Sequence, residues 1–164
     1  MNIIINPVAY ENKYISYLNE CFPGWGNKIN YDWTFKKDFG LRNADFFLIE
    51  NEGEIIAGSA LTYRTVAMPN GQTFVHGTMT GSWTLSAARG KGCFSVIIQE
   101  SEKLVASHQY NFLTAYVTES NASFRRLEAA GSYLVPTNYI ACTIPETDEA
   151  FEITEVVSPS VAVY

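Results

Sequence analysis

The residues best suited to bind a phosphate group lie in one short stretch, "ARGKGCF". Arg89 and Lys91 alternate with Gly90 and Gly92, just ahead of an amphipathic run that reaches Val105. The first amides of a helix lack intrahelical acceptors, and the helix dipole adds partial positive charge there. Glycines allow close backbone approach to a ligand, and cations add charge-assisted contacts. The pattern therefore favours a phosphate or pyrophosphate site, although a solvated strand-to-helix turn would have the same composition.

Two common phosphate motifs are excluded at this turn. A dinucleotide fingerprint needs a third glycine within a parallel strand unit, and a P-loop needs a lysine followed by serine or threonine. Neither pattern occurs here. The chain is also acidic, with a net charge of -6 over 164 residues, so duplex nucleic acid is not an expected partner. A cationic substrate would be attracted, although such charge more often serves solubility.

The expected elements before this turn are one helix and three antiparallel strands. A helix is predicted with Asn6 as its cap and Pro7 in its first turn, and it is expected to end at "FPGWG". Its buried stripe recurs every four residues, at Tyr10, Tyr14, Leu18 and Phe22. Residues 27–43 fit either a short helix or an aromatic loop. From residue 45 the period becomes two, and turns at 51–53 and 69–72 predict a meander that ends near Ser86.

The elements after the turn alternate between helix and strand. Helical spacing from Gly92 is followed by an apolar strand over 111–117 and by a helix that Asn121 caps and Gly131 ends. Residues 133–144 predict one or two final strands, and the acidic tail at about 145–164 fits an edge strand, a dimer contact or a frayed end. Gly77 and Gly81 inside the third strand predict a bulge or the close approach of another backbone or a ligand.

The loop "TLSAARGKGCF" resembles the acetyl-coenzyme A motif of the GNAT superfamily of N-acetyltransferases, V-x-P-x-x-[QR]-x-x-G-x-[GA]. Arg89 and Gly92 match its conserved positions, Thr84 and Ser86 stand at the V and P positions, and Phe94 replaces the last small residue. "NASFRRLEAAGS" resembles a second family motif, N-x-x-[AS] through a helix to a glycine–phenylalanine pair. The resemblance covers about residues 1–145 and implies an α/β (α+β) fold: a mixed, mainly antiparallel sheet of six to seven strands, splayed at a cofactor cleft and flanked by helices.

The resemblance implies a set of cofactor-binding positions. The edge of the third strand would hold the pantetheine arm, the loop amides would hold the pyrophosphate, Arg89 would shape the loop, and Asn121 would meet the distal arm of the cofactor. Arg125 and Arg126 are further candidates for the adenosine phosphate, or are simply solvated. The full set is Ser82, Trp83, Thr84, Arg89, Gly90, Lys91, Gly92, Cys93, Phe94, Ser95 and Asn121.

The implied reaction is direct transfer of the acetyl group to an amine, which needs a group to take the ammonium proton. Relatives often place a glutamate on the strand after the cofactor helix and a tyrosine in the last helix, but Tyr116 and Glu128 stand there in this chain. We therefore consider Glu119, Tyr116 and His76 as acid or base. Each has an ordinary alternative, as a solvated carboxylate, one tyrosine among ten or a structural histidine. Ser123, Tyr133 or positioning alone also remain open.

These observations predict one GNAT-like acyltransferase domain over residues 1–164. The expected activity is acetyl transfer from acetyl-coenzyme A, as cosubstrate and without a metal, to a primary amine of a small molecule or peptide. The alternatives are a non-catalytic module that binds acetyl-coenzyme A or coenzyme A, and a structural domain without a cofactor. Trp25, Tyr31, Trp33 and Phe35 could line an acceptor pocket, although a core or lid role is equally compatible.

The remaining expectations concern compartment and assembly. No apolar run is long enough for a membrane span, and the N-terminus lacks the basic start and cleavage site of a signal peptide. Cys21, Cys93 and Cys142 show no metal-like spacing and fit reduced thiols, so a cytoplasmic protein without a membrane partner is expected. A homodimer is a further possible assembly.

Overall fold

The computed structural model describes residues 1–37 and 40–137. The chain divides into two compact units, Met1–Ser132 and Tyr133–Tyr164. In the second unit, the described residues 133–137 are exposed and have no regular secondary structure. The expected final strands beyond them and the acidic tail lie outside the described residues, as does Cys142.

The first unit contains one five-stranded sheet in the order β1-β2-β3-β4-β5. Its strands are β1 (Asn2–Ile5), β2 (Asp45–Asn51), β3 (Glu54–Ala67), β4 (Thr73–Thr84) and β5 (Phe112–Ala115). All neighbours are antiparallel except β4 and β5, which are parallel because helix α3 (Cys93–Ser107) connects them. The predicted meander and mixed sheet are confirmed, and the described residues contain five strands instead of six to seven.

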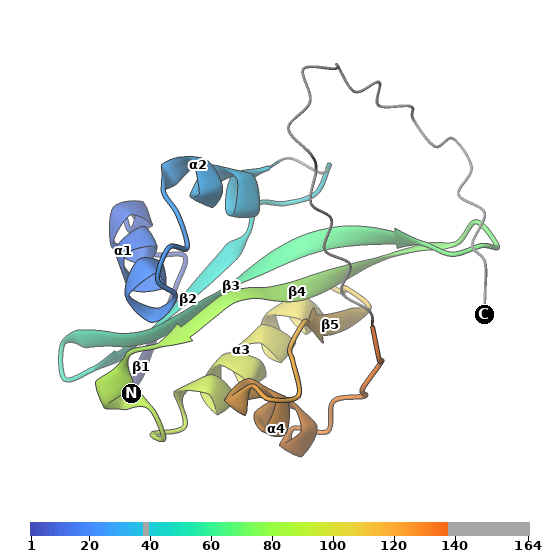
Figure 1. Cartoon of the computed structure of the whole chain (residues 1–164). Coiled ribbons are helices and arrows are strands. Elements are labelled where there is room, and N and C mark those ends of the chain that lie inside the picture. The colour runs from blue at the N-terminus through green and yellow to red at the C-terminus, as the bar shows by residue number, and fades with distance from the viewer. Residues whose placement is uncertain (38–39, 138–164) are drawn as a thin grey trace, which may run out of the picture. The chain divides into compact units, whose positions relative to one another are not determined.

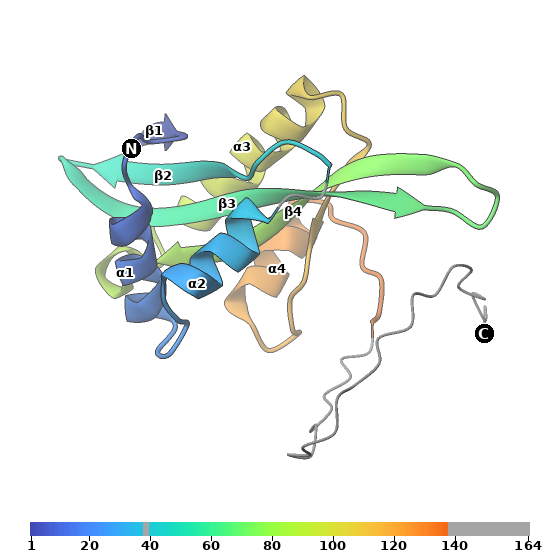
Figure 2. The ribbon, with the colours of Figure 1, turned by 90° about the horizontal axis from the view of Figure 1, so that it is seen from above.

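Helices cover both faces of this sheet. Helix α1 (Glu11–Cys21), the short helix α2 (Lys28–Tyr31) and the π-helical turn η1 (Asp32–Lys36) lie over one face, whereas α3 and α4 (Ala122–Ala129) lie over the other (Figure 1). Side chains alternate along β2 accordingly. Leu48 packs against the α1 side, and Phe47 and Ile49 pack on the α3 side. The β3–β4 hairpin extends beyond the other strands (Figure 2).

The expected start of the first helix is wrong. Residues 2–5 form β1, whose isoleucines pair with β2 (for example Ile3 with Ile49), and α1 begins only at Glu11. Asn6 does not cap a helix: its side-chain oxygen accepts from the Phe46 amide at 2.9 Å, and its amide group donates to Asp45 at 2.7 Å. The isoleucines form an edge strand ahead of the helix because pairing with β2 satisfies their backbone groups.

Both strand glycines have the predicted kind of role. A Cβ on Gly77 would lie 2.6 Å from Val105 Cγ2, so this glycine allows α3 to pack closely on β4. Gly81 has a φ of 59° and sits where the β3–β4 register shifts, because Gly58 pairs with Trp83 but Ala60 pairs with Thr80. One extra residue on β4 therefore makes a bulge at this point.

Candidate functional site

A cleft of about 720 Å³ opens where β4 and β5 separate. The two strands pair from His76–Phe112 to Met79–Ala115, after which β4 continues beside β3 to Thr84 while β5 ends. The part of β4 beyond Met79 therefore has no strand partner on its β5 side within the described residues. A volume of this size is typical of a small-molecule site.

The loop at one end of the cleft leaves several amides without acceptors. A 3₁₀ turn (Ser86–Ala88) is followed by Gly90 and Gly92, each with a φ of 82°, and Gly92 caps α3 without any side-chain hydrogen bond. The amide of Val96 donates to the Gly92 carbonyl at 3.2 Å. Among the described residues 89–95, the amides that find no backbone acceptor are those of Gly90, Gly92, Cys93, Phe94 and Ser95.

Lys91 departs from this arrangement. Its amide donates to the Ala88 carbonyl at 3.3 Å, just as the Arg89 amide donates to Ser86, so the Lys91 amide already has an acceptor within the loop. The donor is bound to the last residue of the 3₁₀ turn. Lys91 also does not line the cleft, whereas every other position of the predicted cofactor set does.

The strand residues of that set contribute in different ways. Trp83 is 3 % exposed, and its indole stacks on Tyr17 with ring centroids 4.6 Å apart. Its side chain therefore anchors β4 to α1, which leaves its backbone for the cleft. The Ser82 hydroxyl hydrogen-bonds Ser59 at 2.7 Å. The strand is thus held rigidly from the β3 side.

The opposite wall comes from the chain after β5. Asn121 caps α4, because its side-chain oxygen accepts from the Ser123 amide at 3.0 Å and from the Ser123 hydroxyl at 2.8 Å. The predicted cap is confirmed, and the oxygen of Asn121 is used within its own turn. Arg126 lines the cleft one turn further along α4. This cation and the unpartnered amides give the cleft donors suited to an anionic ligand.

Sequence patterns did not indicate two lining residues, Cys21 and Phe22. They end α1 and reach the cleft only because α1 packs on β4. No local motif could have revealed them. Burial raises the pKa of the Cys21 thiol, whose sulfur lies 3.7 Å from the Thr84 carbonyl oxygen, so this cysteine is a weak nucleophile.

The three acid–base candidates lie in different places. Tyr116 follows β5 and lines the cleft with 78 % of its surface exposed. Glu119 is exposed in the turn before α4 and does not line the cleft. His76 is 7 % exposed on β4, outside the cleft, with Nδ1 3.0 Å from the Thr114 hydroxyl and its ring stacked on Phe112. Burial lowers the pKa of His76, and the charge of Arg64 lowers it further.

The aromatic segment after α1 is mostly core. Tyr31 and Phe35 are 5 % and 3 % exposed and pack edge to face, and the Trp25 ring stacks on Phe35. Tyr31 and Phe35 therefore have the core role and do not line an acceptor pocket, because the rings of Tyr14 and Phe46 pack against both of them. Trp33 is exposed, with the Lys37 ammonium 5.2 Å from its ring centre.

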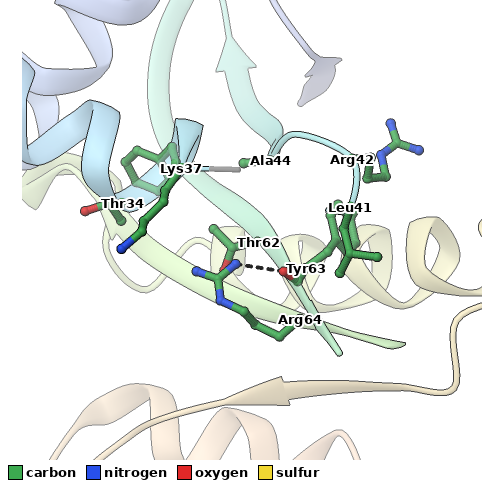
Figure 3. A pocket seen from close by; sticks show the side chains of 9 residues that line it. Thr34, Lys37, Leu41, Arg42, Ala44, Thr62, Tyr63 and Arg64 are labelled. Atoms are coloured by element: carbon green, nitrogen blue, oxygen red, sulfur yellow. Dashed lines mark hydrogen bonds between the residues drawn. The ribbon is translucent and has the colours of Figure 1, made fainter. Parts of the chain in front are cut away.

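A second hollow lies between η1, the chain before β2, and β3 (Figure 3). Lys37 and Arg64 reach toward it, while the Arg42 guanidinium points away from it (Figure 3). The Arg64 guanidinium donates to the Tyr63 carbonyl at 2.7 Å. The hollow has a volume of about 10 Å³, which accommodates no more than a water molecule, so it is no substrate pocket.

Two absences concern the described residues alone. Residues 1–37 and 40–137 contain no group of three histidine, cysteine or acidic side chains placed to hold a metal ion. No helix within these ranges has the length and apolar character that crossing a membrane requires.

Solved structures resemble the chain closely in three dimensions. A predicted acetyltransferase with acetyl-CoA from Clostridium acetobutylicum matches 87% of this chain and 95% of its own, with a TM-score of 0.66 and 12% identity. AAC(6')-Iy in complex with the bisubstrate analogue CoA-S-monomethyl-acetylneamine matches 88% and 99%, with a TM-score of 0.66 and 10% identity. The fold is that of the GNAT acetyltransferases.

The GNAT fold also occurs in a neighbour that is described differently. A transcriptional regulator from Bacillus halodurans C-125 matches 87% of this chain and 99% of its own, with a TM-score of 0.65 and 16% identity. No model of a protein family and no curated protein matches the sequence. The likeness at these identities therefore establishes the fold, and activity has to be argued from the site.

Proposed function

We propose that the protein transfers an acetyl group from acetyl-coenzyme A to a primary amine of a small molecule or peptide. One observation carries the proposal: a large cleft between separated strands ends at a helix start whose amides have no acceptor. Unpaired amides at a helix start favour an anion, and here Cys93, Phe94 and Ser95 are buried or half-buried beside the cleft while Gly92 is exposed, so an anionic ligand in the cleft would complete them. The acetyl-coenzyme A and analogue named for two neighbours of the same fold support the choice of ligand.

Different segments of the cleft would bind different parts of the cofactor. The amides of Gly92, Cys93, Phe94 and Ser95 would bind the pyrophosphate, with Arg126 attracting the phosphate charge. The free edge of β4 at Ser82, Trp83 and Thr84 would hydrogen-bond the pantetheine arm as a strand partner does. This extended grip would leave the thioester near Met79 and Gly81, where the bulge lies.

The chemistry at the thioester is direct acyl transfer in a ternary complex. Backbone amides around the β4 bulge would stabilise negative charge that develops on the carbonyl oxygen. Tyr116 lines the cleft and is the candidate to protonate the leaving thiolate. For the amine proton, His76 and Glu119 are the candidates, and neither lines the cleft. Glu119 is the less favoured because it is exposed in a turn, whereas His76 is buried beside the Thr114 hydroxyl.

Thermal shift and thiol release test the proposal together. Melting is followed with acetyl-coenzyme A, coenzyme A or no ligand, and free thiol is then measured across a panel of amines. We expect stabilisation by both ligands and thiol release with at least one amine. Absence of any ligand-induced shift would contradict the proposed site. The free thiols of Cys21 and Cys93 fit the reducing cytosol that we propose as the compartment.

The second candidate function is a module that binds acetyl-coenzyme A without turnover. The neighbour described as a transcriptional regulator, and the absence of a carboxylate at the usual position held by Tyr116, favour it. It predicts stabilisation by both ligands with no thiol release from any amine, so the same experiment separates the two functions.

A further inference from the structure

A connected group of polar side chains lies on the face of the sheet opposite α3. The hydroxyls of Thr78 and Thr114 are 3.0 Å apart, across the parallel β4–β5 pair. His76 Nδ1 lies 3.0 Å from the Thr114 hydroxyl and 3.5 Å from that of Thr78. The three groups therefore form a short hydrogen-bonded path that ends on an imidazole nitrogen.

This path begins beside the cleft. Thr78 and Thr114 are register partners, and the next pair along the strands, Met79 and Ala115, lines the cleft where the strands separate. Met79 packs on the α3 side, so side-chain alternation places His76, Thr78 and Thr80 on the other face. Thr78 and Thr114 are both half-buried, and Thr78 is the end of the path away from His76, where a molecule that approaches the thioester from that face would meet it.

His76 is suited to receive a proton at the end of the path. Its ring is 7 % exposed and stacked on Phe112, which holds the imidazole in one orientation. Burial and the charge of Arg64, its register partner on β3, lower its pKa, so the ring is neutral near pH 7. Among the described residues of β3, β4 and β5 that surround it, Arg64 is the charged group that faces His76.

We propose that His76 is the terminal acceptor of the amine proton and that the Thr78 and Thr114 hydroxyls relay it. The inference rests on the proposed acetyl transfer. As the nitrogen–carbon bond forms and the carbon–sulfur bond breaks, the thiolate leaves with the bonding electron pair. The ammonium proton passes to the Thr78 oxygen, the Thr78 proton passes to Thr114, and the Thr114 proton passes to His76 Nδ1. Each hydroxyl gains and loses one proton, so the relay is unchanged after the step.

The relay explains why no carboxylate is needed at the position of Tyr116. A histidine two residues before Thr78 on the same face of β4 supplies the titrating group, and two hydroxyls bridge it to the reaction. His76 acts through these hydroxyls and is therefore a positioning and proton-storing residue. Loss of general-base assistance of this kind lowers rates by about 100- to 10,000-fold.

The test is the pH dependence of kcat/KM for wild type, His76→Gln, Thr78→Val and Thr114→Val. Two acceptor amines whose pKa values differ by about two units are compared, since only a limb that belongs to the enzyme stays in place when the acceptor changes. Thr62→Val is the matched control. It removes a buried hydroxyl on the same face, paired with Thr80 at 3.0 Å, which is no part of the path.

We expect an acceptor-independent acid limb in wild type and in Thr62→Val that disappears in His76→Gln. Thr78→Val and Thr114→Val should lower kcat/KM at least about tenfold while the thermal shift with coenzyme A is retained. An unchanged limb in His76→Gln, or an equal loss in Thr62→Val, would overturn the relay in an active enzyme. Wild type that binds coenzyme A but releases thiol with no amine would overturn the proposed transfer itself.

Discussion

Gly92→Val separates the loop's role in binding from its role in folding. Gly92 has a φ of 82° and no atom within 4 Å of an added Cβ, so the substitution strains the backbone without a clash. A side chain in the left-handed region costs about 1–2 kcal/mol, which for a domain of this size lowers the melting temperature by about 2–8 °C. Relief of that strain would rotate the amides of residues 92–95 away from the cleft.

The effect on binding should be much larger than the effect on folding. Hydrogen bonds to charged groups contribute about 1.5–3 kcal/mol each, so losing two of the four amide contacts weakens coenzyme A binding by at least about 100-fold. At a ligand concentration about 100 times the wild-type Kd, the stabilisation would fall from about 2.7 to about 0.4 kcal/mol. Thermal shift and calorimetric titration with coenzyme A measure both quantities.

Gly71→Val is the matched control for this experiment. Gly71 lies in the β3–β4 turn, has a φ of 83° and likewise has open space around an added Cβ. We expect the same modest loss of stability with the full coenzyme A shift retained. A Gly92→Val protein that binds coenzyme A as tightly as wild type would refute the assignment of the loop amides, as would an equal loss of binding in Gly71→Val.

Three further predictions concern the scaffold. Gly77→Ala should destabilise by about 1–3 kcal/mol in urea, because its Cβ would meet Val105 Cγ2 at 2.6 Å, and Val105→Ala should recover part of that loss. Asp45→Asn should lower the free energy of unfolding by about 1–3 kcal/mol, because this carboxylate is 2 % exposed and accepts from Tyr63 at 2.5 Å, and an amide cannot satisfy every donor. Equal urea midpoints for wild type and variant would contradict this. The pKa of His76 lies below its ordinary 6.5, so the unfolded chain binds more protons than the folded chain as the pH falls through that value. Wild type should therefore lose stability relative to His76→Gln between about pH 7.5 and 5.5. A difference in unfolding free energy between the two proteins, measured in urea, that does not change with pH would refute this.

The sequence allowed the local elements around the loop to be predicted closely. The β2–β3–β4 meander, the start of α3 at Gly92 and the Asn121 cap of α4 all depend on residues within one turn or one hairpin. Period, capping and turn chemistry act over such short separations. The start of α1 was predicted wrongly because the isoleucines at 3–5 form a strand only by pairing with β2, and no local pattern shows that pairing.

Side-chain roles followed tertiary contacts that no local pattern encodes. Whether Tyr31 and Phe35 are core or pocket depends on Tyr14 and Phe46, which approach from α1 and β2. The ends of α1 enter the cleft wall for the same reason. Pattern reasoning identifies which residues are apolar or chemically capable, but packing determines which of them face one another.

The chain alone determined that a strand-to-helix turn would present glycines, cations and unpartnered amides, because hydrogen bonding at a helix start is a property of consecutive residues. Only the tertiary structure decided what these donors face. The cleft exists because β4 and β5 stop pairing after Met79 and Ala115, and the His76 path exists because Thr114 arrives beside Thr78 from 36 residues further along the chain. Such register is set by packing across the sheet, where one residue of slip would reverse every side chain.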